Sequence, residues 1–200
     1  MSRRLWLAAL TLLLGWGALH GWNRRAMHPA PGVLAPDVPE QIDLAQGAQL
    51  QRGDVTLTTR AHFSLTARVL SRADYHWGAD AKLIPEDLAL GWGRMSDSAV
   101  LDQIDIHQSD RYYYWRVKQF PIPRREIETS SANMHLIPAD AGVRGAMERV
   151  RPGQLVRLEG FLVDARRADG WQWRTSMTRE DTGGGACELV YVESLLLESR

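Results

Sequence analysis

Cysteine and surplus charge are both scarce in this chain. Cys187 is the only cysteine in 200 residues, so no intramolecular disulfide can form and packing must stabilise the fold. Lysine plus arginine and aspartate plus glutamate are equal, at 24 each. The chain therefore lacks the positive surplus with which proteins commonly bind nucleic-acid phosphates, and we expect no nucleic-acid partner.

Recurrent catalytic and metal-binding motifs are also missing. No Gly-x-Ser-x-Gly, His-x-x-x-His or Cys-x-x-Cys pattern occurs, which argues against a serine-hydrolase elbow and a paired metal site. The glycines 183–185 lack the lysine of a phosphate-binding loop and precede an expected strand. We therefore expect neither a metal nor a cofactor.

One long uncharged run, "LWLAALTLLLGWGALHGW" at 5–22, lies between two arginine pairs. As a helix it would cover about 27 Å, close to the thickness of the hydrocarbon core. Trp6 and Trp22 stand near its ends, where indole rings prefer the lipid headgroups. The pattern predicts an uncleaved transmembrane signal anchor after a cytoplasmic tail at 1–4, with a cleaved signal peptide as the alternative.

The remaining chain divides into a spacer and a domain. Residues 23–39 contain four prolines, which favours an extended spacer, and residues 40–200 form the expected soluble domain. A short tail, one span and a soluble domain are typical of signal-anchored bacterial proteins. We therefore predict a single-pass protein of the bacterial inner membrane whose C-terminal domain faces the periplasm.

Within that domain, periodicity predicts a mainly β fold with one or two short helices. Two short apolar patterns predict helices, at 96–104 with Ser96 as N-cap and at 139–150 with Asp140 as N-cap. The expected strands are 54–60 and 61–72, which could form one long bent strand, then 103–108, 111–118, 153–165, 170–178 and 187–198.

The helix at 139–150 is followed directly by "PGQLVRLEGFLV", a strand interrupted by glycine. This order resembles small Greek-key barrels of the OB type over residues 55–198. With "LALGWGRMSD", "SANMHLIPAD" and "DTGGGACELVYVE" in sequence, the chain also resembles uncharacterised membrane-anchored proteins of bacterial envelopes. The resemblance implies a small OB-like barrel behind a single N-terminal span, and no particular activity.

A ligand-binding face is predicted on the strand "RYYYWRVK". Alternation places Tyr112, Tyr114 and Arg116 on one face, with Tyr113, Trp115 and Val117 toward the core. An aromatic and cationic stripe of this kind suits a glycan or an extended polymer, although exposed tyrosines are also common on strands for packing reasons.

Two further residues are candidates for the same ligand. Trp92, between two glycines, either closes one end of the fold or lines a groove, and Arg179 adds charge beside the triple glycine. The glycines themselves are expected to form the tip of a hairpin, or else a loop whose N–H groups bind an anion.

Cys187 is the candidate nucleophile, with His135 or His76 as its base. The order of His135 and Cys187 in a signal-anchored chain of this length is similar to that in sortases, which would imply a transpeptidase or hydrolase. However, "GGGA" departs from the Thr-Leu-x-Thr that precedes the sortase cysteine, and only Arg200 follows Cys187. The ordinary alternative is a small buried thiol.

These features predict a membrane-anchored binding or accessory module that recognises a protein partner or a glycan in the envelope. The alternative function is a cysteine-dependent, sortase-like enzyme at the outer face of the membrane.

Overall fold

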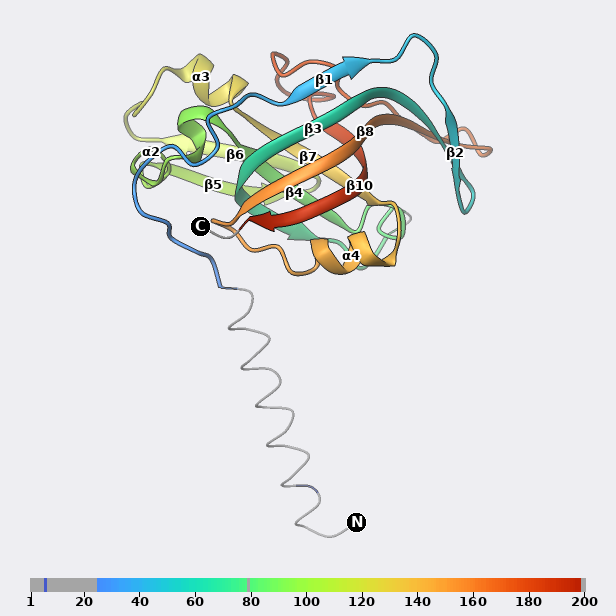
Figure 1. Ribbon diagram of the computed structural model, residues 1–200, viewed down its shortest axis with the longest axis horizontal. Helices are drawn as coiled ribbons and strands as arrows, with labels where there is room; N and C mark the ends of the chain where they lie inside the picture. Colours follow the sequence, from blue (N-terminus) through green and yellow to red (C-terminus); the bar gives the residue numbers. More distant parts are fainter. Residues whose placement is uncertain (1–5, 7–24, 79, 199–200) are drawn as a thin grey trace.

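The computed structural model describes residues 6, 25–78 and 80–198. It confirms a mainly β fold with a few short helices (Figure 1). Apart from Trp6, the predicted anchor at 5–22 lies outside the described residues. No helix among the described residues has the length and apolar character needed to cross a bilayer.

The strands and helices of the described residues follow one another along the chain in a fixed order. The strands are β1 (Glu40–Asp43), β2 (Gln49–Arg52), β3 (Val55–Asp74), β4 (Glu86–Gly91), β5 (Ile104–Ser109), β6 (Tyr112–Val117), β7 (Ser131–Pro138), β8 (Leu155–Arg167), β9 (Gln172–Trp173) and β10 (Glu188–Glu198). The helices are the 3-10 helix η1 (Gly93–Ser96) and the α-helices α2 (Ser98–Leu101), α3 (Arg124–Thr129) and α4 (Ala141–Met147).

Five strands pair in a ring. β3 pairs with β4, β4 with β7, β7 with β10, β10 with β8, and β8 pairs again with β3. The pair of β7 and β10 is parallel, and the other four pairs are antiparallel. β1 and β2 extend the sheet along β3, and β9 extends it along β8.

β3 is the long bent strand that the two adjoining patterns predicted. Its odd-numbered residues from Val55 to Val69 are buried, because alternate side chains point to one face of a strand. The register with β8 shifts between Thr59 and Ala61. Such a bulge bends a strand and re-aims its side chains, and here it separates the buried residues of β3 into two clusters.

Gly160 lies at a close approach of β8 to β10. A Cβ at this position would lie 2.0 Å from the carbonyl oxygen of Tyr191, so only glycine fits. Opposite Gly160, the register of β10 shifts between Val192 and Ser194. The glycine that interrupts the predicted strand therefore accommodates a bulge in its neighbour.

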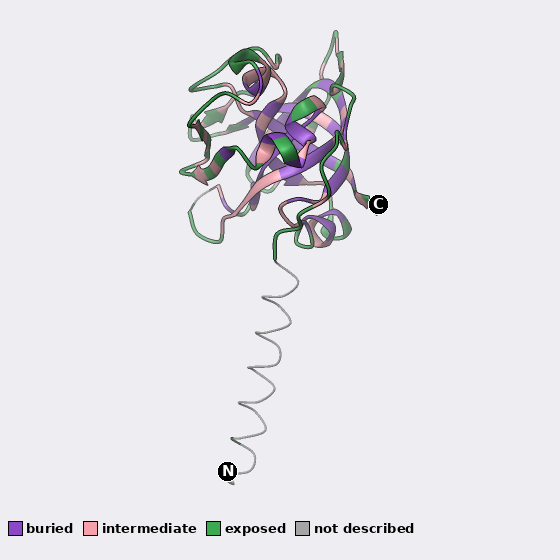
Figure 2. Ribbon diagram, turned by 90° about the vertical axis from the view of Figure 1, so that its left-hand side faces the viewer, coloured by how far each residue is buried: buried purple, intermediate pink, exposed green. Residues whose placement is uncertain are grey.

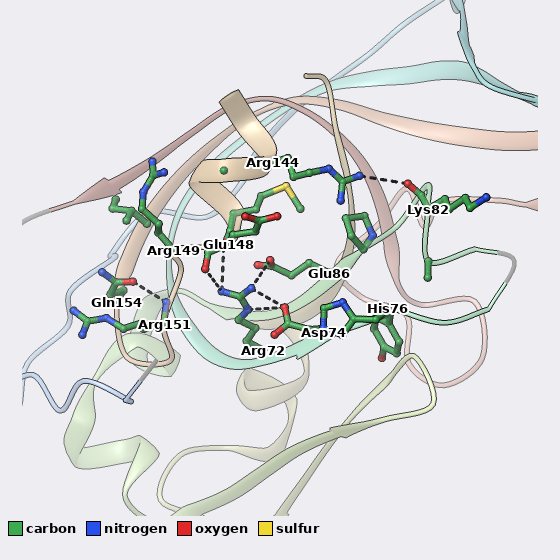
Figure 3. A pocket seen from close by; sticks show the side chains of 16 residues that line it. Arg72, Asp74, His76, Lys82, Glu86, Arg144, Glu148, Arg149, Arg151 and Gln154 are labelled. Carbon is green, nitrogen blue, oxygen red and sulfur yellow. Dashed lines mark hydrogen bonds and ion pairs between the residues drawn. The ribbon is translucent and has the colours of Figure 1, made fainter. Parts of the chain in front are cut away.

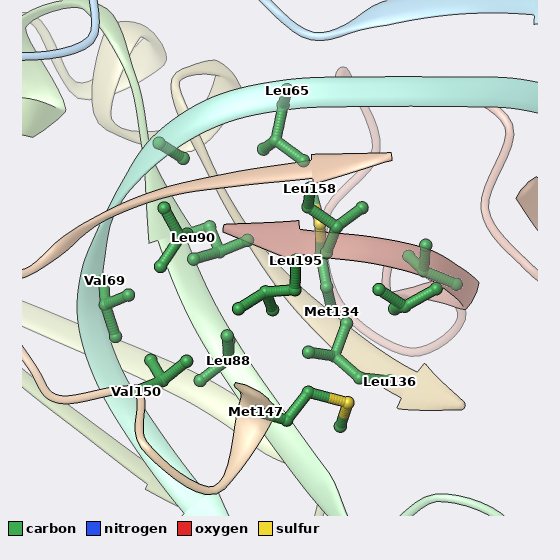
Figure 4. Packing of buried hydrophobic residues seen from close by; sticks show 14 of the residues in the cluster. Leu65, Val69, Leu88, Leu90, Met134, Leu136, Met147, Val150, Leu158 and Leu195 are labelled. Carbon is green, nitrogen blue, oxygen red and sulfur yellow. The ribbon is translucent and has the colours of Figure 1, made fainter. Parts of the chain in front are cut away.

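The main hydrophobic core lies inside the ring of strands, where β3, β4, β7, β8 and β10 contribute residues such as Leu65, Leu90 and Leu158 (Figure 4). α4 closes one side of this core with Val143 and Met147. The buried residues concentrate in the strands and the exposed residues in the outer loops (Figure 2). A second cluster lies against β10 and β8, with Trp171 and Trp173 packed on it.

The segment between β4 and β7 carries the hairpin of β5 and β6. Its two turn residues, Asp110 and Arg111, both have positive φ, of 52° and 69°, which fits the type I′ turn that two-residue hairpins favour. A third apolar cluster, which includes Met95, Ile104 and Ile127, forms the core of this segment. The hairpin prediction is thus confirmed.

The helix predictions are confirmed in part. Asp140 accepts a hydrogen bond from the backbone N–H of Val143 and caps α4, as predicted. The expected helix at 96–104 is shorter, since only α2 lies within it and η1 ends at Ser96; the cap of α2 is Asp97, whose carboxylate accepts from Ala99 N–H. α3 was not predicted. The expected strand at 170–178 is paired only at β9.

The described part of the proline-rich segment, from residue 25, runs along the domain. Met27 N–H donates to the carbonyl of Pro152 at 2.8 Å, and the hydroxyl of Ser96 accepts from the N–H groups of Leu34 and Ala35. Ala35 is buried. The segment is therefore hydrogen-bonded to the domain at both ends of this stretch.

Candidate functional site

Four predicted site residues meet at one cleft, a cavity of about 430 Å³. One wall is β6, from Tyr112 to Trp115, and the floor comes from β7, from Ser131 to Asn133. The opposite wall is the loop between Arg179 and Glu188, which includes Cys187. We call this cavity the β6 cleft.

The β6 wall has the two faces that the sequence predicted. Tyr112 and Tyr114 are 45% and 44% exposed, and Tyr113 and Trp115 are half-buried. The ring of Tyr114 stacks on His107 with 5.1 Å between centroids. Arg116 shares the outer face, where it forms an exposed ion pair with Asp105 at 3.3 Å.

Four consecutive residues of β6 line the cleft, and this defines where the cleft lies. Successive side chains of a strand point to opposite faces, so a cavity that touches all four must run along the edge of the strand. In the described residues β6 pairs with β5 alone. The cleft therefore borders a strand edge that has no partner strand.

The backbone groups at this edge follow from the hairpin. Ser109 and Tyr112 form the pair that flanks the two-residue turn, and such a pair is hydrogen-bonded across the ladder. Pairing then alternates, so that Tyr112 and Tyr114 turn their N–H and C=O groups to β5. Tyr113 and Trp115 turn theirs to the cleft.

A buried ion pair lies at the end of the opposite wall. Arg179 Nε is 2.6 Å from Glu188 Oε1, and the Glu188 side chain is 1% exposed. Burial raises the pKa of Glu188 to about 8, against the opposing effect of Arg179. Arg179 also donates to Gln41 Oε1 at 3.3 Å. Its guanidinium is thus held by the protein itself.

Behind β6, a polar cluster fastens the hairpin to the sheet. Asp87 is fully buried on β4, and its Oδ1 lies 2.8 Å from Arg111 Nη1 and 2.9 Å from His135 Nδ1. Arg111 also packs over the Tyr75 ring at 3.5 Å. Asn133 donates to the carbonyl of Arg111 at 3.0 Å. This cluster holds β6 at a fixed distance from the floor of the cleft.

Cys187 is not activated in this environment. Burial is the largest cause that raises the pKa of its thiol to about 11, and the nearby carboxylates of Glu188, Asp87 and Asp181 act in the same direction. The one opposing contact is Asn133 Nδ2, 3.8 Å from the sulfur. A nucleophilic thiol needs a cation or a base that favours the thiolate, and the surroundings of Cys187 do the opposite.

The two histidine candidates lie elsewhere. His135 is 1% exposed, with Nδ1 toward Asp87 and its ring 4.6 Å from the Trp173 ring. His76 is exposed and lines a different cavity from Cys187. Trp92 is 1% exposed inside the main core, so a ligand does not reach its ring.

The triple glycine forms part of the cleft wall and does not join two paired strands. β9 pairs with β8, and β10 pairs with β7 and β8, so the expected hairpin between the last two strands is wrong. Gly183 and Gly185 have positive φ, of 86° and 90°. The loop therefore needs glycine at two positions for its conformation.

Several residues of the site carried no clear signal in the sequence. Glu188 directly follows Cys187 at the start of an apolar strand. A carboxylate in an otherwise apolar strand was the one signal in the sequence that this residue forms a buried ion pair. Asp87 and Asn133 both contact Arg111, and only the pairing of β4 with β7 brings them to the same cluster. No three potential metal ligands come together in the described part of the chain.

Comparison with known proteins gave no relative for this arrangement. No protein-family model matches the chain, and neither a curated protein nor a solved structure does so.

Proposed function

We propose that this chain is a membrane-anchored binding module that holds an extended peptide segment of a protein partner along the free edge of β6. The observation that carries the proposal is the position of the β6 cleft, which is lined by four consecutive residues of a strand paired on one side only. Main-chain hydrogen bonds to such an edge supply affinity, and neighbouring pockets supply specificity.

The charges of the cleft suggest what the peptide carries. Glu188 is paired with Arg179, and Glu128 lies 2.8 Å from Arg124. Asp181 is exposed and accepts from Ser176 Oγ at 2.9 Å, but no cation lies within ion-pair distance of it among the described residues. A basic side chain of the peptide would satisfy this carboxylate, and apolar neighbours would pack on the tyrosines.

The ring of strands supports an OB-like barrel as the scaffold of this module. The five strands pair in a closed ring that contains one parallel pair, and a helix precedes the fourth strand of the ring. Both features agree with the OB type. In OB-folds the face of the second and third strands binds oligomeric ligands, together with the loop between strands one and two and the loop between strands four and five. Here these strands are β4 and β7, and the hairpin covers them. The ligand position would then move beside the hairpin, into the β6 cleft.

The anchor and its location remain part of the proposal. The uncharged run at 5–22 supports a single span of the bacterial inner membrane, and the resemblance to envelope proteins supports a periplasmic domain. An accessory subunit that presents a peptide-binding edge near the bilayer agrees with this placement.

The geometry favours a peptide over a glycan. A glycan would stack on Tyr112 and Tyr114, whose rings are half exposed on the outer face of β6. The cavity instead follows the strand edge, where backbone groups are presented. The cysteine-dependent enzyme has less support, because Cys187 has a raised thiol pKa and His135 is oriented toward Asp87.

The experiment is a peptide selection on the full chain purified in an uncharged detergent. A displayed peptide library should yield extended sequences with a basic residue. Their affinity should fall about tenfold in Asp181→Asn, in line with the loss of a charged hydrogen-bond partner. Asp54→Asn, on the turn between β2 and β3, is the matched control and should not change affinity.

Selected peptides that bind both variants equally would remove Asp181 from the site. No selected peptide, together with glycan binding that is lost in Tyr112→Ala and Tyr114→Ala, would replace the peptide proposal by the glycan.

A further inference from the structure

A second and larger cavity, of about 1020 Å³, lies beside α4. Its walls come from the segment between β3 and β4, from α4 itself and from the loop between α4 and β8 (Figure 3). We call it the α4 basin. Arg72, on β3, lies at its centre, and several other basic side chains surround it (Figure 3).

Arg72 is fully committed to the protein. Its Nη2 lies 2.6 Å from Asp74 Oδ1 and 3.0 Å from Glu86 Oε2. Its Nη1 donates to three carbonyls at the end of α4, including that of Val150 at 2.6 Å. These contacts give hydrogen-bond donors to carbonyls at the C-terminal end of α4 and just after it, where helical pairing ends. Arg72 therefore builds the floor of the basin and has little capacity left for a ligand.

The other cations of the basin are different. Among the described residues, no carboxylate lies within ion-pair distance of Lys82, Arg144, Arg149 or Arg151. Most other arginines of the described residues have such a partner. Four cations without an anion therefore gather around one cavity, and only Glu148 adds an acidic side chain outside the Arg72 cluster.

The basin lies where the chain enters the domain from its N-terminal side. Met27 N–H donates to Pro152, directly after Arg151, and a Cβ on Gly153 would lie 1.9 Å from the carbonyl oxygen of Met27. Met27 lies five positions after Trp22, the end of the predicted anchor, and five positions of chain can span at most about 18 Å. α4 and the chain entry lie on the same side of the domain (Figure 1).

An exposed indole lies next to this cavity. Trp77 is 91% exposed and directly follows His76, which lines the basin. Tryptophan is enriched at the headgroup level of membranes because its ring is apolar and its N–H is polar. Cations without an ion-pair partner among the described residues, with an exposed tryptophan next to them, suit contact with an anionic lipid surface.

We propose that the α4 basin binds the phosphate of an anionic phospholipid headgroup through Lys82, Arg149 and Arg151. Guanidinium groups bind phosphate oxygens through paired charge-assisted hydrogen bonds, and the lipid tails would remain in the bilayer beside the anchor. The site is separate from the β6 cleft and rests only on the anchor being a membrane span. It would fix the orientation in which the domain presents β6.

The test uses the full chain in an uncharged detergent, with native mass spectrometry to count retained lipid. Phosphatidylglycerol should be retained at least about tenfold more strongly than phosphatidylcholine, since each basic residue near anionic lipid contributes appreciably. The triple variant Lys82→Gln, Arg149→Gln and Arg151→Gln should lose this preference. The triple variant Lys118→Gln, Arg166→Gln and Arg174→Gln removes equal charge outside the basin and should keep it.

Equal losses in both triple variants would mean that net charge alone attracts the lipid, and would overturn the site. Displacement of the lipid by millimolar inorganic phosphate would show a free-phosphate site and would also overturn the lipid assignment. Peptide binding at β6 is measured separately, so failure there leaves this result unchanged.

Discussion

The β6 cleft and the α4 basin differ in what they leave unsatisfied. In the cleft, Arg179 and Glu188 neutralise each other, and the groups without partners are the backbone N–H and C=O groups of an edge strand. In the basin, backbone carbonyls just after α4 accept from Arg72, and the distinctive groups are cations with no carboxylate within ion-pair distance among the described residues. The first arrangement suits a peptide backbone, and the second suits an anion.

Both cavities nevertheless contain the same kind of interaction, an ion pair between a buried glutamate and an arginine. Glu188 closes the cleft and Glu86 lies below the basin, and burial raises the pKa of each to about 8. The difference between the two sites thus lies in the groups around the ion pair.

The largest expected effect is at the cluster that holds β6. Asp87→Ala should lower the free energy of unfolding by about 3–5 kcal/mol, because it leaves Arg111 and His135 buried without their carboxylate. Urea unfolding of the full chain in detergent measures this. Asp105→Ala breaks the exposed pair with Arg116 and should cost under about 1 kcal/mol. Equal costs would show that the cluster does not hold the hairpin.

The buried glutamates predict a pH dependence of stability. A carboxyl group whose pKa is higher in the folded state keeps its proton longer there, so the folded state binds more protons between about pH 4.5 and about pH 8. The free energy of unfolding should therefore fall as the pH rises through this window. Unfolding curves from pH 5.5 to 8 provide the measurement.

Glu188→Gln and Glu86→Gln should each flatten this slope, because each removes one titrating group. If Glu188→Gln leaves the slope unchanged while Glu86→Gln flattens it, Glu188 of the cleft does not contribute to the pH dependence. The two buried glutamates would then not behave alike.

A smaller effect is expected in the glycine loop of the cleft. Gly183→Ala and Gly185→Ala should each destabilise the domain by about 1 kcal/mol, because both positions have positive φ. Gly184→Ala should be nearly neutral, since its φ is ordinary and no atom lies within 4 Å of the added Cβ. Thermal unfolding of the three variants would settle this. Equal melting temperatures would contradict the conformational role of the loop.

The smallest change concerns reactivity alone. With a thiol pKa of about 11, Cys187 should react with iodoacetamide at pH 7 at least about tenfold more slowly than free cysteine. His135→Ala should leave this rate unchanged, because His135 is oriented toward Asp87. Fast alkylation that His135→Ala suppresses would restore the enzyme hypothesis.

The sequence predicted the elements whose patterns are local. β3 alternates along its first fifteen residues, the β5–β6 hairpin has a two-residue turn, and α4 begins at a capping aspartate. β4 escaped prediction because all six of its residues are buried and no alternation remains. β7 escaped because its first residues are polar, and their partners come from distant parts of the chain.

The candidate site was predictable only as separate residues. Tyr112, Tyr114, Arg179 and Cys187 were each expected to matter, and the structure places them around one cavity. Their meeting depends on the hairpin lying across β4 and β7, which no local pattern encodes. Trp92 and His76 do not line this cavity, because Trp92 is buried in the core and His76 lies at the α4 basin. Both positions depend on tertiary structure, which the sequence pattern does not reveal.

The most direct test of peptide binding at the β6 edge is backbone amide exchange across β6, measured with and without a selected peptide. In the free full chain, the N–H groups of Tyr113 and Trp115 should exchange faster than those of Tyr112 and Tyr114, which face β5. Bound peptide should slow Tyr113 and Trp115 by about tenfold or more, since their N–H groups would then be paired. Bound peptide that leaves both amides unchanged would contradict strand addition at this edge.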